Sequence, residues 1–145
     1  MALLGSAGHS ATAAGLGLVI GTDVQAYDAA TAKTNVAQSF TKAQSSTPVA
    51  VTSTTNSIAT VASGSNIFTH TFTEDTTLAN PSALVTGTYY TWIFTQHASA
   101  AKTLALGNLF VPLGTAFTVT TTTSAKATLT ALYDGTSLLY TYAQA

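Results

Sequence analysis

The sequence predicts a mainly β protein: a β-sandwich or jelly-roll-like domain that follows an extended N-terminal arm and one short helix. Threonine supplies about a fifth of the 145 residues, and six Tyr and six Phe add further residues that favour strands. After residue 47, apolar and polar residues alternate in several short runs, which is the pattern of half-buried strands. Turn-forming residues separate these runs about every ten residues, a spacing typical of all-β domains.

The chain carries little charge. Asp, Glu, Lys and Arg make up 6% of the residues and the net charge is -1, whereas soluble domains usually carry about 25% charged residues. A β-rich surface without charges tends to associate edge to edge unless partners already cover its strand edges and apolar faces. We therefore expect the chain to be part of a closed homo-oligomer.

Nucleic acid and membranes are not expected as partners. The lysines are scattered along the sequence, so they form no basic stripe that could neutralise a row of phosphates: Lys33, Lys42, Lys102 and Lys126. The longest uninterrupted apolar run, 13–21, is too short to span a bilayer.

Residues 1–46 are predicted to form the arm and the helix, which would make contacts between subunits. Several glycines among small residues precede residue 22, and this composition supplies little material for a core. The apolar stretch 16–20 gives the arm something to bury. Such an arm is either disordered or ordered by lying on another subunit, and we favour the second.

The segment 28–44 is the best helix candidate, because Ala32, Val36 and Phe40 recur at helical spacing. Its apolar face is narrow, so the helix needs a partner such as its own symmetry mates. The residues expected to contact other subunits, or the surface to which they attach, are Leu16, Leu18, Val19, Ile20, Val36 and Phe40.

Residues 47–145 are predicted to form the β-sandwich domain, with seven or eight strands. The expected strands are 49–52, 67–72, 88–96, 102–106, 117–122, 128–133 and 136–142. The pair Asp134-Gly135 separates the last two, and this pair predicts a β-hairpin with a type I′ turn.

Two of these strands have a clear apolar face. In the first, Phe68 and Phe72 flank His70 on one side of the strand. In the strand 88–96 the aromatic side chains alternate with threonines, and the face that should lie in the core holds Tyr90, Trp92 and Phe94.

Groups that could support catalysis are scarce. Glu74 and Asp75 are neighbours, so in a strand they would point to opposite sides, and a solvated turn explains them better than an acid–base pair. His9, His70 and His97 lack the short spacings of zinc ligands. We therefore predict no enzymatic activity, no cofactor and no metal site.

Two alternatives concern binding. His70 could lie on the axis of a symmetric trimer and form a three-histidine site, although a hydrogen-bonded histidine in a half-buried strand is the more common outcome. The aromatic residues of 89–94 and 133–142 could line a carbohydrate-binding surface, but their alternation favours packing in the core.

Several short motifs follow a known pattern. They are Thr77-Leu78-Ala79-Asn80-Pro81, then Gly87, the strand end Ile93-Phe94-Thr95-Gln96, and Thr103-Leu104-Ala105-Leu106-Gly107. Together these motifs resemble a β module found in virion surface proteins of tailed bacteriophages, both head decoration proteins and fibre proteins. The upstream stretch 21–28, running into 40–44, is similar to the connector that often precedes such modules. The chain departs from the module at 97–100, where a glycine-containing hairpin turn would be expected.

The resemblance implies a homotrimer without cofactor or catalysis. Fibres that touch a receptor are usually long, so the size of this chain favours a capsid decoration, or cement, protein. Such a protein would sit on the capsid surface where major capsid proteins meet, and its arm would join subunits or grip the shell. The alternative is a short tail or head fibre module that binds a host receptor.

Overall fold

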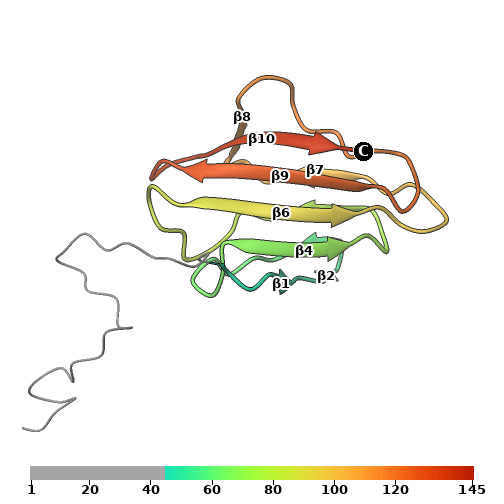
Figure 1. Ribbon diagram of the computed structural model, residues 1–145, viewed down its shortest axis with the longest axis horizontal. Coiled ribbons are helices and arrows are strands. Elements are labelled where there is room, and N and C mark those ends of the chain that lie inside the picture. Colours follow the sequence, from blue (N-terminus) through green and yellow to red (C-terminus); the bar gives the residue numbers. More distant parts are fainter. Residues whose placement is uncertain (1–44) are drawn as a thin grey trace, which may run out of the picture. The chain divides into compact units, whose positions relative to one another are not determined.

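The computed structural model describes residues 45–145, which form ten β-strands in two sheets and contain no helix (Figure 1). The prediction of a mainly β protein is therefore confirmed for this part of the chain. The predicted arm and helix lie outside the described residues, and so do the predicted contact residues Leu16, Leu18, Val19, Ile20, Val36 and Phe40.

The six-stranded sheet has the order β1-β4-β6-β9-β10-β8, and the four-stranded sheet has the order β2-β3-β5-β7. The strands are β1 (Val49–Ala50), β2 (Ser53–Thr54), β3 (Ser57–Ile58), β4 (Ile67–Thr71), β5 (Thr76–Leu78), β6 (Tyr89–Thr95), β7 (Leu104–Leu106), β8 (Phe110–Pro112), β9 (Lys126–Tyr133) and β10 (Leu138–Gln144).

The chain runs through these sheets as a stack of coils. From β3 to β8 successive strands belong in turn to the small and the large sheet. Strand β5 pairs in parallel with β3, β6 with β4 and β7 with β5, so each lies beside the equivalent strand of the preceding coil. Parallel stacking aligns Ile58, Leu78 and Leu106 in one row of the small sheet. This connectivity differs from the antiparallel strand order of a jelly roll, which alternation along single strands cannot distinguish from parallel coils.

A β-hairpin interrupts the stack. Strands β9 and β10 are antiparallel to each other and lie between β6 and β8 in the large sheet (Figure 1). Strand β8 pairs in parallel with β10 and not with β6. The hairpin therefore widens the large sheet, and β9 is its one strand that runs against the others.

Stacked turns join the two sheets at one end of the coils. The Asn80 side chain donates to the Asn108 side chain of the next coil (2.6 Å) and accepts from the backbone N–H of Leu109 (3.1 Å). A Cβ atom at position 107 would overlap this Asn80 side chain. Glycine at 107 thus permits the close approach that locks one turn on the next.

The core lies between the two sheets and is rich in aromatic side chains. Tyr90, Trp92 and Phe94 of β6 are buried, as predicted, while Thr91 and Ile93 face outward. Trp92 stacks near Phe68 of β4 and donates from Nε1 to the Thr60 hydroxyl after β3 (3.2 Å). The same side chain therefore contributes apolar packing and a satisfied polar contact across the core.

One predicted strand, 117–122, is absent. Its apolar residues Phe117 and Val119 are buried, which explains the alternating pattern. The backbone of this segment bonds to side chains instead of a neighbouring strand: the Phe117 N–H donates to the Tyr140 hydroxyl (3.0 Å), and the Thr120 carbonyl accepts from the Gln96 amide (2.8 Å). A chain that buries alternate side chains need not belong to a sheet.

Gln96 holds this region together. Its side chain is buried and uses all four of its hydrogen-bonding positions. The amide nitrogen donates to the carbonyls of Lys102 and Thr120, and the amide oxygen accepts from the N–H groups of His97 and Lys102. A single side chain thus ties the end of β6 to the chain before β7 and to the segment that precedes β9.

The last hairpin is present, but its turn is not the predicted type I′. Tyr133 pairs with Leu138, so four residues connect the strands. Type I′ requires positive φ at both central residues, and among the residues of this loop only Gly135 has it. The Asp134 carboxylate instead accepts from the N–H groups of Thr136 and Ser137, which closes a longer loop.

At 97–100, where the sequence departs from the glycine-containing hairpin turn of the phage module, the chain crosses from the large sheet to the small one. The ring nitrogen Nδ1 of His97 accepts from the N–H groups of Ser99 and Ala100 (both 3.2 Å). This side chain organises the crossing in place of a glycine turn.

The Gln96 contacts predict a large effect of a small substitution. We expect Gln96→Leu to lower the free energy of unfolding by about 2–4 kcal/mol, because it leaves buried backbone groups unpaired and each costs about 1–3 kcal/mol. Chemical denaturation measures this loss. The matched control is Gln144→Leu at an exposed position, which should change stability by less than about 0.5 kcal/mol; equal effects of the two substitutions would show that the Gln96 contacts do not stabilise the fold.

The exposed carboxylates predict a loss of stability in acid. Backbone N–H donors, from Ser137 and Thr136 for Asp134 and from Thr103 for Asp75, hold the pKa of each carboxyl below its ordinary value of 3.8. A lowered folded-state pKa stabilises the fold above pH 3.8, and this contribution disappears as the pH falls through the folded-state pKa.

We therefore expect the unfolding free energy of the double variant Asp75→Asn, Asp134→Asn to depend less on pH below about 4 than that of the parent chain. Denaturant titrations at a series of pH values measure this difference. Parallel pH profiles for the two proteins would contradict the assignment.

Candidate functional site

His70 is the most unusual polar residue among those the structure describes. It lies on the inner face of β4, and its side chain is buried. Its ring nitrogen Nδ1 is 2.9 Å from the Val51 carbonyl oxygen and its ring packs edge-on against Phe72. The predicted position on one face with Phe68 and Phe72 is confirmed.

The contact with Val51 determines the form of the neutral imidazole. A carbonyl oxygen only accepts hydrogen bonds, so Nδ1 must carry the proton and Nε2 must present a lone pair. Nε2 is buried and has no hydrogen-bond partner in residues 45–145. His70 therefore offers an oriented acceptor that the described part of the chain leaves unused.

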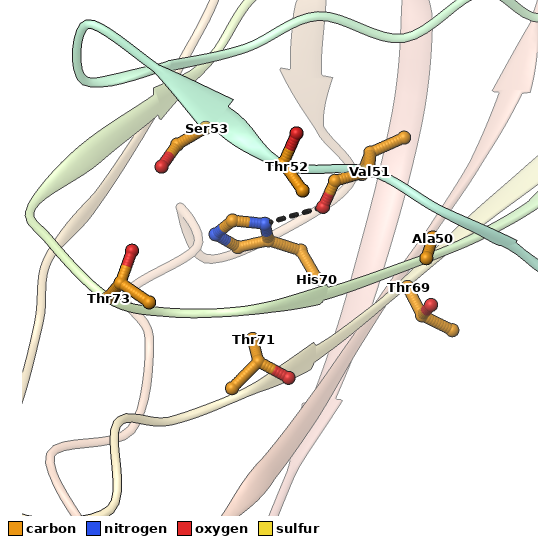
Figure 2. A pocket seen from close by; sticks show the side chains of 8 residues that line it. All are labelled: Ala50, Val51, Thr52, Ser53, Thr69, His70, Thr71 and Thr73. Carbon is orange, nitrogen blue, oxygen red and sulfur yellow. Dashed lines mark hydrogen bonds between the residues drawn. The ribbon is translucent and has the colours of Figure 1, made fainter.

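A pocket of about 280 Å³ opens beside this ring (Figure 2). It exists because β1 pairs with β4 for only a short distance: after the bond from the Val51 N–H to the Thr69 carbonyl, the chain turns away toward β2. Figure 2 shows the Nε2 side of the ring facing the gap between Ser53 and Thr73. The lining residues are Ala50, Val51, Thr52, Ser53, Thr69, His70, Thr71 and Thr73.

A carboxylate borders the pocket. The Ser53 hydroxyl donates to the Glu74 carboxylate (2.6 Å). Ser53 is thus hydrogen-bonded to a negative group at the wall of the pocket.

The predicted turn at Glu74 and Asp75 precedes β5 directly. The two carboxylates have different partners: Glu74 accepts from Ser53, whereas Asp75 accepts from the Thr103 N–H (2.7 Å) and links the starts of two coils. They do not form an acid–base pair.

The described residues bring together no metal-binding cluster. Within 45–145 no group of three or more His, Asp or Glu side chains could hold an ion. His97 lies in the β6–β7 crossing, away from the lining of the His70 pocket, and His9 lies outside the described residues. The same part of the chain has no helix long and apolar enough to cross a membrane.

A second candidate site is the outer face of the six-stranded sheet. Cross-strand pairing aligns two rows of side chains there, and the Thr91 and Thr130 hydroxyls are hydrogen-bonded (3.2 Å). The outward residues of β4, β6, β9 and β10 include a single charged side chain, Lys126. The first row is Ile67, Thr91, Thr130 and Thr141, and the second is Thr69, Ile93, Thr128 and Ala143.

Exposed apolar side chains lie beside this face. Val61, Val85 and Tyr89 are each about three-fifths exposed, at 61%, 60% and 61%. Val61 and Val85 belong to the turns that precede β4 and β6, which stack through the pairing of Val61 with Ser82, and Tyr89 is the first residue of β6. Val111 and Leu113 are exposed at the edge formed by β8. Apolar groups that collect at one end and one edge are typical of contact surfaces.

The comparisons with known proteins do not identify the chain. No protein-family model, no curated protein and no solved structure matches it. The chemistry of these two sites is therefore the basis on which a function can be proposed.

Proposed function

We propose that the chain is a structural virion protein, a capsid decoration or cement protein that stabilises a bacteriophage head as a homotrimer. The observation that carries this proposal is the outer face of the six-stranded sheet, where β4, β6, β9 and β10 present one charged side chain, Lys126. In this proposal the two facing sheets act as a sandwich-like building block and the subunits intertwine through their N-terminal arms.

Association through this face is energetically reasonable. The Thr91 and Thr130 hydroxyls bond to each other, which leaves the threonine methyl groups to face outward, and isoleucine side chains lie in the same rows. Burying such a surface yields about 25 cal/mol per Å² of apolar area, with few charges to desolvate. In a shell the same contact repeats in every copy, so modest contacts add up against the internal pressure of packaged DNA.

The segment 1–46 has the second role in the proposal. Its apolar residues at 16–20, together with Val36 and Phe40, are the proposed contacts with other subunits and with the major capsid protein. The β domain alone would supply the block, and the arm would supply the attachment.

A short fibre module that binds a host receptor is the alternative. The His70 pocket favours it, because an oriented acceptor among hydroxyl groups is a feature of ligand sites and not of shell contacts. On this alternative the protein would bind host cells when isolated.

Oligomeric state gives the first test. We expect a trimer whose molar mass, measured by light scattering, stays constant on dilution. Thr130→Glu should shift the protein toward monomer, since it places a carboxylate in the uncharged face. Thr121→Glu, at an exposed position outside the sheet, is the control and should leave the mass unchanged; a stable monomeric parent chain would overturn the proposal.

The virion assignment has its own test. Deletion of residues 1–21 should weaken the trimer or its binding to the shell, and mass spectrometry of purified virions should detect the intact chain. If the chain is missing from the particles, the assignment to the capsid is wrong even where the trimer is stable.

A further inference from the structure

We propose that the pocket beside His70 binds a single neutral sugar ring, with one sugar hydroxyl donating to the Nε2 atom of His70. This inference goes beyond the structural role proposed above and does not depend on it. It rests on the unused acceptor, on the composition of the pocket wall and on the charges around it.

The first observation is the unused hydrogen-bond acceptor, the Nε2 atom of His70. Because Nδ1 donates to the Val51 carbonyl, Nε2 has a lone pair fixed in direction. A buried acceptor without a partner is unfavourable, so a ligand that brings a donor gains more there than at an exposed site. Hydroxyl, amide and ammonium groups are the donors that could fill it.

The side chains that line the pocket favour a hydroxyl group among these donors. Thr52, Ser53 and Thr73 place hydroxyl groups around the opening, and a hydroxyl can both donate and accept. Neighbouring hydroxyls of a sugar have the same dual character, so the two sets match.

Charge and the small number of ligand groups disfavour an anion and a metal ion. No lysine lines the pocket, and the Ser53 hydroxyl of its wall donates to the Glu74 carboxylate, so the lining offers an anion such as phosphate no compensating cation. A metal ion would find one imidazole and no cluster of three ligands in residues 45–145. The volume of about 280 Å³ is below that of sites for drug-sized ligands, about 300–1,000 Å³, and suits one ring.

The test uses the full chain with glucose, galactose and N-acetylglucosamine, each titrated into the millimolar range. The side-chain nitrogen resonance of His70 Nε2 is followed by NMR. A donated hydrogen bond should shift this resonance in a saturable way with at least one of the three sugars, while the Nε2 resonance of His97 stays unchanged.

Two variants distinguish binding from general loss of structure. His70→Ala should abolish saturable binding, and because it also removes a core side chain, its fold is checked by circular dichroism. Thr73→Val preserves the side-chain shape and removes one hydroxyl, so it should weaken binding about threefold to tenfold. Thr121→Val, outside the pocket, is the matched control and should bind like the parent chain.

The outcomes are decisive in both directions. A saturable His70 shift that weakens in Thr73→Val supports the sugar site. The absence of any shift with all three sugars overturns the proposal. Equal affinity in Thr73→Val and the parent chain overturns it as well.

Discussion

Strand β6 is the constraint on which the rest of the described structure depends. It pairs along its whole length with the antiparallel strand β9 and from Thr91 to Thr95 with the parallel strand β4, and it carries three buried aromatic side chains. Its parallel partner continues the coil, whereas its antiparallel partner starts the inserted hairpin. At its end, Gln96 fixes the crossing to β7 and the extended segment before β9. The same strand therefore contributes to the core, to the stacked coils and to the attachment of the β9–β10 hairpin.

Alternation of apolar residues reveals a strand only where the strand is long enough. Strands β4 and β6 could be predicted because each buries every second residue over five or seven positions. Strands β2 and β3 have two residues each, so they contain no period, and their positions depend on pairing with neighbouring coils. The segment 117–122 shows the opposite error: it alternates, but its backbone bonds to Tyr140 and Gln96 side chains. Hydrogen-bond partners distant in sequence leave no mark on local composition.

The candidate site, like the fold, could be predicted from the sequence only in part. The position of His70 on the inner face follows from its place between two phenylalanines, and the structure confirms it. The pocket could not be predicted, because it arises where β1 leaves β4 and the chain crosses to the other sheet. The motifs at 77–81 and 103–107, which support the resemblance to phage proteins, contain most of β5 and β7 and reach into the turns that stack through Asn80 and Gly107. Their residues thus have a clear structural reason, which is separate from any function.

The edges of the large sheet bear on how copies could associate. Its two edge strands are short: β1 has two residues and β8 has three, with Pro112 at the end of β8. Short edge strands and prolines are the means by which β proteins prevent edge-to-edge growth. The low charge of the chain was expected to require protected strand edges. In the large sheet the short edge strands β1 and β8 provide this protection. Within residues 45–145, the broad face of threonine and isoleucine carries one charged side chain, Lys126, and a partner can pack on such a face without extending the sheet. This arrangement favours a closed assembly over a fibrous one, because a face can be fully covered by a limited number of copies whereas an open edge always offers another.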